Sequence, residues 1–178
     1  MSGVGSRFVV MNDPLAGIST ALACVDATWG MRSGGDRAPA NELAATTLVE
    51  VNDALGVARR HLEAVHASVA SEIARRSRAE LGPEGLAKQH GFRSPTALIA
   101  ATTGTTMGDA GRLVAVGEAT TPRMTFSGAL APARHPFVGA GMAAGTIGTL
   151  AASAIISMLD RVALRADCDE LPRVEALL

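Results

Sequence analysis

The fold is decided by residues 91–123, which read GFRSPTALIAATTGTTMGDAGRLVAVGEATTPR. Ser94 followed by Pro95 predicts a helix start, because a serine hydroxyl accepts a hydrogen bond at the N-cap and proline suits the first helical position. The first helix is expected to run to about residue 103. It ends there because Gly104 can take the left-handed backbone of a helix C-terminus.

A second helix is predicted directly after this turn, from about residue 107 to residue 120. Thr106 and Asp109 have the spacing of a capping box in which aspartate replaces the usual glutamate. A helix, a glycine turn and a second helix are typical of a helix-turn-helix. DNA binding is therefore the first function to consider.

The same plan recurs in residues 136–163. Pro136 predicts a short helix, Gly145 ends it, and a longer apolar helix is expected over about 149–166. Residues 136–159 carry no charged side chain, so a membrane span has to be weighed. The glycines that interrupt this run favour two helices over a span, and we expect no contact with a membrane.

The longest helix is expected over residues 42–79, with Asn41 as its N-cap. Its apolar residues alternate at spacings of three and four, namely Leu48, Val51, Leu55, Ala58, Leu62, Val65 and Val69. A shorter helix over 14–29 has the same spacing in Leu15, Ile18, Leu22, Val25 and Trp29. The two stripes favour packing within one chain, while a homo-oligomer through the 48–69 seam remains the alternative.

These patterns predict an all-α protein, a helical bundle of about six or seven helices with one long helix and two helix-turn-helix-like units. We expect three parts: an N-terminal tail, helix and loop (1–41), a helical domain (42–166), and an acidic C-terminal tail (167–178) that begins a further region. Residues 121–135 are rich in proline and are expected to form a long loop.

The charges exclude a strongly basic protein. The formal net charge is −1, so no global field attracts nucleic acid. Residues 85–135 nevertheless carry five cations against two acids, a local charge of +3. The arginines at 59, 60, 75, 76 and 78 alternate with glutamates and are expected to form a solvated, salt-bridged helix face.

No catalytic, metal-binding or cofactor-binding motif is found. The sequence contains no P-loop, nucleophile elbow, zinc-protease helix or dinucleotide fingerprint. Four dispersed histidines have no metal-ligand spacing, so we expect no metal, no cofactor and no catalytic residue. Cys24 and Cys168 are expected to be reduced thiols, and no secretion signal precedes them, which indicates a cytoplasmic protein.

Four segments together resemble the 13E12 repeat family, the helical domain of unknown function found N-terminal to HNH endonuclease domains. They are GFRSPTALIAATTG, GRLVAVGEAT, LAPARHPFVGAGMAAGTIG and IISMLDRV, within about residues 42–165. The resemblance implies an all-helical, nucleic-acid-associated protein. In such proteins the HNH motif lies beyond the position of residue 178, so no nuclease residue is carried over. Relatives carry several arginines after the turn, whereas this chain has Arg112 alone.

The sequence thus supports two functional hypotheses. The first is a non-catalytic domain that assists an HNH-endonuclease-like protein in binding duplex DNA. Its expected contacts are Arg93, Thr105, Thr106, Arg112, Arg123 and Arg134. The second is a protein-protein interaction or oligomerisation domain that makes no contact with nucleic acid.

Overall fold

A computed structural model describes residues 14–30, 35–124, 128–163 and 175. Within these residues the regular secondary structure is helical apart from one two-stranded hairpin, which confirms the all-α prediction. The α-helices are α1 (Pro14–Trp29), α2 (Ala45–Arg75), α3 (Leu86–Gln89), α4 (Pro95–Thr103), α5 (Met107–Thr120), α6 (Pro136–Ala143) and α7 (Thr149–Ala163). Two short 3-10 helices, η1 (Ala40–Glu42) and η2 (Ala79–Glu84), flank α2.

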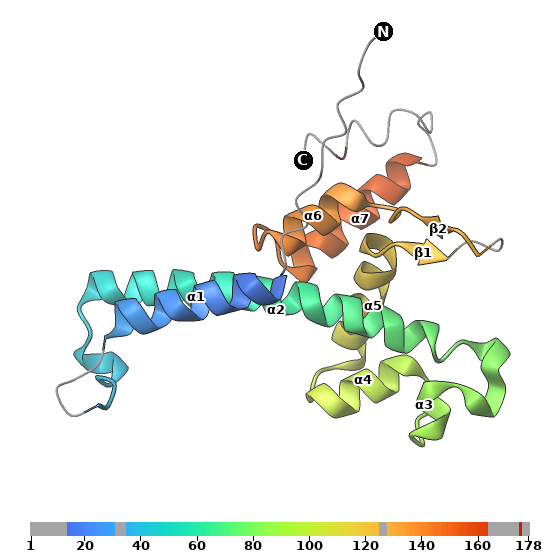
Figure 1. Ribbon diagram of the computed structural model, residues 1–178, viewed down its shortest axis with the longest axis horizontal. Coiled ribbons are helices and arrows are strands. Elements are labelled where there is room, and N and C mark those ends of the chain that lie inside the picture. Colours follow the sequence, from blue (N-terminus) through green and yellow to red (C-terminus); the bar gives the residue numbers. More distant parts are fainter. Residues whose placement is uncertain (1–13, 31–34, 125–127, 164–174, 176–178) are drawn as a thin grey trace, which may run out of the picture.

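The long helix α2 is the axis of the molecule (Figure 1). Its N-terminal part lies beside α1, and this helical hairpin projects from the rest of the protein. The C-terminal part of α2 is crossed by α5, with α3 and α4 on one side and α6 and α7 on the other. α1 therefore lies along the N-terminal part of α2, and the body of the protein is built around its C-terminal part.

Both helix-turn-helix-like units form as predicted. The Ser94 hydroxyl accepts a hydrogen bond from the backbone N–H of Ala97 at 3.1 Å, and Gly104 ends α4 with a φ of 68°. In the second unit Gly145 also has a φ of 68°, between α6 and α7. Side chains other than glycine rarely adopt this backbone conformation, which explains the position of both turns.

The main core lies where α2, α4, α5, α6 and α7 meet. Its most deeply buried large side chains are Ile99, Val116 and Leu159. Alanines fill the rest, which allows the helices to approach closely. At the closest point Gly117 of α5 packs directly on the backbone of α2 at Ala67. The second unit closes this core, since α7 contacts α5.

α1 packs on α2 as expected, but only part of each predicted apolar stripe takes part in the contact. The contact is formed by Ala21 and Val25 of α1 with Val51 and Ala54 of α2, while Trp29 is partly buried beside them. Exposed apolar side chains include Leu15, Leu22, Leu48, Leu55, Leu62 and Val69. The predicted pairing of these two helices within one chain is therefore confirmed, but several residues of both stripes remain outside the contact. The helices approach each other closely on the side that carries small buried residues such as Ala21 and Ala54, so the leucines remain exposed on another side.

Two further local predictions are corrected. Asn41 lies within η1, and the N-cap position of α2 is Ala44, which makes no side-chain capping bond. Part of the expected loop 121–135 forms an antiparallel pair, β1 (Arg123–Met124) with β2 (Leu130–Ala131). Both strands are two residues long, so no alternating pattern was available to predict them.

Candidate nucleic-acid interface

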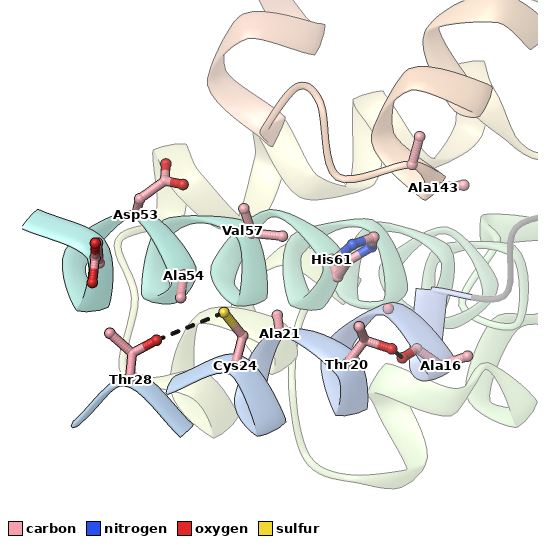
Figure 2. Close-up of a pocket in the computed structure, with 13 residues that line it drawn as sticks. Ala16, Thr20, Ala21, Cys24, Thr28, Asp53, Ala54, Val57, His61 and Ala143 are labelled. Atoms are coloured by element: carbon pink, nitrogen blue, oxygen red, sulfur yellow. Dashed lines mark hydrogen bonds between the residues drawn. The ribbon is translucent and has the colours of Figure 1, made fainter. Parts of the chain in front are cut away.

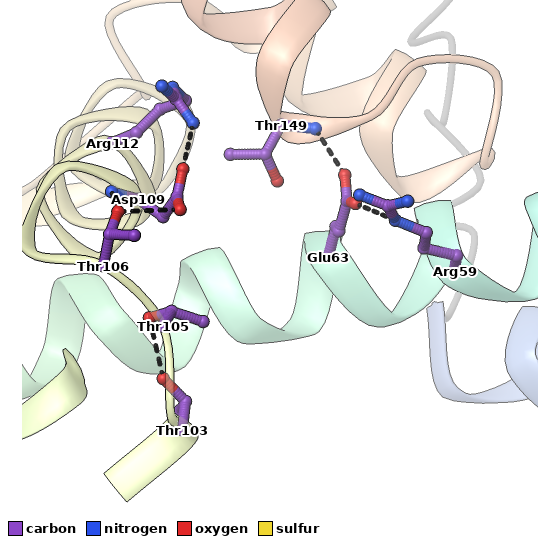
Figure 3. Close-up of polar contacts among 8 residues, drawn as sticks. All are labelled: Arg59, Glu63, Thr103, Thr105, Thr106, Asp109, Arg112 and Thr149. Carbon is purple, nitrogen blue, oxygen red and sulfur yellow. Dashed lines mark hydrogen bonds and ion pairs between the residues drawn. The ribbon is translucent and has the colours of Figure 1, made fainter. Parts of the chain in front are cut away.

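The turn between α4 and α5 is held by local hydrogen bonds (Figure 3). The Thr106 hydroxyl accepts from the backbone N–H of Asp109 at 3.0 Å and donates to the Asp109 carboxylate at 2.8 Å. Arg112 pairs with the same carboxylate at 2.6 Å. The Thr106 hydroxyl first, and then Arg112, hold the pKa of Asp109 below its ordinary value. The charge of Arg112 is therefore compensated on its own helix.

The six residues predicted to contact nucleic acid do not form one cluster. Thr105 and Thr106 lie at the start of α5, and Arg112 follows within its second turn. Arg123 and Arg134 lie beyond the other end of α5, about 20 Å away along a helix of 14 residues. Arg93 is separate again, before the start of α4.

α5 itself presents little that could contact the edges of DNA bases. Its residues Ala110, Leu113, Val116, Gly117 and Ala119 are buried between the neighbouring helices. Its exposed positions are Met107, Gly108, Ala115 and Glu118, and none of them is cationic. α5 therefore acts as the central core helix, and the wide polar face of a recognition helix is absent from it.

A different surface gathers cations from distant parts of the chain. Arg75 and Arg78, at and just beyond the end of α2, line one hollow of about 730 Å³ together with Arg123 of β1. We call this surface the arginine groove. Glu72 and Glu118 also line it, so its charge is only weakly positive.

The arginines of this groove differ in how they are paired. Glu72 accepts two hydrogen bonds from Arg75 and one from Arg76, each at 2.6 Å. These bonds, led by those from Arg75, lower the pKa of Glu72 to about 2. By contrast, neither Arg78 nor Arg123 forms an ion pair with any residue in the described ranges.

Two of the three hydroxyl groups that line the groove already donate hydrogen bonds within the protein, and the third belongs to Ser68. Ser71 donates to the Ser68 carbonyl at 2.8 Å, and Thr121 donates to the Gly117 carbonyl at 2.7 Å. An anion in the groove would therefore be bound chiefly by guanidinium groups. The sequence predicted the salt-bridged face around Glu72, but nothing in it indicates that Arg78 lies near Arg123.

Arg134 belongs to a second polar cluster next to α6. It pairs with Asp160 at 3.4 Å, and the same carboxylate contacts Nε2 of His135 at 3.1 Å. His135 itself is buried. On its other side the ring lies 3.7 Å from the carboxylate of Glu175.

Two carboxylates cap helix N-termini from distant positions. Glu175 is buried and accepts from the backbone N–H groups of Phe137 and Val138, at 2.9 and 3.0 Å, at the start of α6. Glu63 of α2 accepts from the N–H of Thr149 at 2.7 Å, at the start of α7 (Figure 3). All three bonds satisfy N–H groups that a helix leaves unpaired, with a favourable sign of charge. Glu175 is the one residue of the expected acidic tail 167–178 that the structure describes.

Another hollow of about 730 Å³ lies between α1, α2 and α6 (Figure 2). Most of its lining is small and apolar, with Glu50 and Asp53 at one end. At the other end His61 is buried, and its Nδ1 has no hydrogen-bond partner. In the described part of the chain, no group of three or more histidine, cysteine or acidic residues is placed to hold a metal ion.

His61 is held in a gap between two glycines. A methyl group at Gly17 of α1 would lie 2.5 Å from its Nδ1, and one at Gly145 would lie 2.6 Å from its Nε2. Arg60 donates to the Gly145 carbonyl beside it at 2.5 Å. This histidine therefore joins the helical hairpin to the α6–α7 turn.

The comparison with known protein families gives one match, to residues 49–178, which is 130 of the 178 residues. The chain belongs to the DUF222 family, a domain of unknown function. The match to DUF222 begins within α2, so α1 lies outside it. Neither the curated proteins nor the solved structures include a significant match.

The DUF222 model includes all four segments that resemble the 13E12 repeats, but its description does not mention those repeats. The narrower resemblance therefore stays a prediction. None of the helices in the described ranges combines the length and the apolar character needed to cross a membrane.

Proposed function

We propose that this DUF222 domain is a non-catalytic, N-terminal helical domain of an HNH-endonuclease-like protein and that it assists the binding of duplex DNA. The association with an HNH domain rests on the resemblance to the 13E12 repeats. One observation carries the DNA contact, namely that Arg75, Arg78 and Arg123 line one groove. Guanidinium groups bind phosphate through paired, charge-assisted hydrogen bonds.

The proposal assigns different roles to the three arginines. Arg78 and Arg123 bind DNA phosphates directly, because neither has a carboxylate partner in the described part of the chain. Arg75 holds Glu72 and contributes less, since its charge is compensated. Contacts of this kind position a protein on DNA but do not read the base sequence. We therefore expect binding with little sequence preference.

The test is a fluorescence-anisotropy titration of a labelled DNA duplex over a series of salt concentrations. Arg78→Ala with Arg123→Ala should weaken binding at least tenfold at low salt. It should also lower the slope of log affinity against log salt by about 2, since each phosphate contact contributes roughly 0.9. Arg161→Ala, an exposed arginine of α7, is the control and should change neither quantity by much.

A second pair of variants compares the groove with the helix-turn-helix. Arg93→Ala with Arg112→Ala removes the cations predicted near α4 and α5 and should have the smaller effect, because Arg112 is already paired with Asp109. If this pair has the larger effect, DNA binds at the turn and the groove is the wrong site. If the unmutated chain binds no duplex at low salt, the DNA proposal fails as a whole.

The alternative function is an interaction or oligomerisation domain without nucleic-acid contact. It is favoured by a separate observation, the exposed leucines of α2 within the 48–69 seam. The same DNA titration distinguishes the two functions, because an interaction domain should show no saturable binding even at low salt.

A further inference from the structure

The projecting helical hairpin carries a row of exposed leucines. Leu22 of α1 is 48% exposed, and Leu48, Leu55 and Leu62 of α2 are 42%, 44% and 58% exposed. We call these four residues the leucine face. The three leucines of α2 are seven residues apart, the spacing at which an apolar stripe meets a partner helix.

The leucines of both helices lie on the same flank of the hairpin. Thr20 and Cys24 of α1 line the hollow between α1, α2 and α6. Leu22 is two residues from each of them, which places it about 160° from both around the helix axis. On α2, Leu55 has the same relation to Asp53 and Val57, which line the same hollow. The leucine face is therefore opposite this hollow.

The leucine face also points away from the body of the protein. Ala143 of α6 and Ala144, just beyond its end, line the hollow, and Figure 2 shows Ala143 on that side of the hairpin. The body thus approaches the hairpin from the flank that carries no leucine row. Contiguous exposed apolar surface of this kind on a soluble domain marks an interaction site.

We propose that the leucine face binds the leucine face of a second copy of this chain, so that two hairpins form a four-helix bundle. This inference rests on the interaction function and is independent of the arginine groove. A two-fold interface needs a surface that is complementary to itself. The leucine face meets this need, because leucines spaced by seven residues can interdigitate with an identical row.

The size of the surface fits a dimer contact. α1 has 16 residues and so is about 24 Å long, and two adjacent helices are about 20 Å wide. The hairpin thus offers a footprint of about 500 Å², and side chains at its edges extend it toward the roughly 800 Å² per partner of a stable complex. The leucines form the apolar centre. Asn52 and Arg59 are exposed and each follows a leucine of the row by four residues, which places them at its polar edge.

The experiment measures the mass of the full chain by light scattering after gel filtration, without DNA and over a wide range of concentration. The unmutated chain should have twice the mass of one copy. Leu55→Glu with Leu62→Glu should shift it to the mass of one copy, with the far-ultraviolet circular dichroism unchanged. Val49→Glu is the matched control, because Val49 is 70% exposed on α2 but lies off the leucine face, and it should leave the dimer intact.

A second measurement covers the case in which the double glutamate variant fails to fold. With Cys24 and Cys168 replaced by serine, Leu55→Cys should form a disulfide-linked dimer on mild oxidation, whereas Val49→Cys should not. A chain that is monomeric at every concentration overturns the proposal. So does a dimer that survives in a folded Leu55→Glu, Leu62→Glu variant, or equal cross-linking of the two cysteine variants. None of these results depends on DNA binding.

Discussion

Replacing Gly117 by alanine should show how closely α2 and α5 cross. A methyl group at this position would lie 2.8 Å from the carbonyl carbon of Ala67 and 2.9 Å from the Cβ of Ser71. It would be closer still to the Ala67 carbonyl oxygen. Carbon atoms in contact are normally about 3.5–4.0 Å apart, so the two helices would have to separate by about 1 Å.

The cost of this separation is large because backbone atoms cannot turn away as a side chain can. Overpacking a core typically costs about 1–3 kcal/mol, and more where the backbone must shift. Alanine also favours the helix by about 1 kcal/mol over glycine, which offsets part of the loss. Because the clash here is with backbone atoms, we take a cost of about 4 kcal/mol, which leaves a net loss of about 3 kcal/mol in the free energy of unfolding. For a chain of this size, that lowers Tm by about 6–12 °C.

The measurement is thermal and urea unfolding followed by circular dichroism, at one protein concentration for all variants. Gly111→Ala on the same helix is the control, because its methyl group would meet the Thr96 methyl at an ordinary 3.9 Å. This control should gain up to about 1 kcal/mol. The close crossing at residue 117 is refuted if the Tm of Gly117→Ala equals or exceeds that of the unmutated chain. It is also refuted if Gly117→Ala and Gly111→Ala change Tm by the same amount.

Two further substitutions test contacts between distant segments. Gly17→Ala should lower the free energy of unfolding by about 1–3 kcal/mol through its clash with His61. Adding His61→Ala should restore part of that loss in a double-mutant cycle, and strict additivity would contradict the contact. Glu175→Ala should cost about 1–2 kcal/mol in urea unfolding because it uncaps α6, and Glu175→Gln should cost less. Unchanged stability in Glu175→Ala would show that this cap is not formed.

Much of the fold could be predicted because its signals are local. Ser94 with Pro95, Gly104, and Thr106 with Asp109 each act within one turn of helix, and the structure shows the bonds and the backbone angle that they predict. The prediction that Asn41 is the N-cap of α2 was wrong, although it also rested on a local signal. A residue suited to capping does not have to be the one at which the helix begins. Here Asn41 lies inside the short helix η1, and the N-cap position of α2 is Ala44.

The candidate surfaces could not be predicted in this way, because contacts between distant residues create them. Arg78 and Arg123 are 45 positions apart in the sequence and share a groove only after α5 has crossed α2. The apolar spacing in α1 and α2 predicted correctly that these helices pair, but it did not show which side of each helix faces the other.

The sequence by itself determined the all-helical fold, the two helix-turn-helix-like units and the absence of strong positive charge. These follow from helix periodicity, capping chemistry and composition, which depend on near neighbours. Only the tertiary structure decided that α5 is enclosed as a core helix, that the leucines of the hairpin remain exposed, and that Glu175 caps α6. The first two outcomes depend on how closely two helices approach, and small residues such as Gly117 and Ala67 set that distance where α5 crosses α2. The third depends on a hydrogen-bonded contact between residues far apart in the sequence.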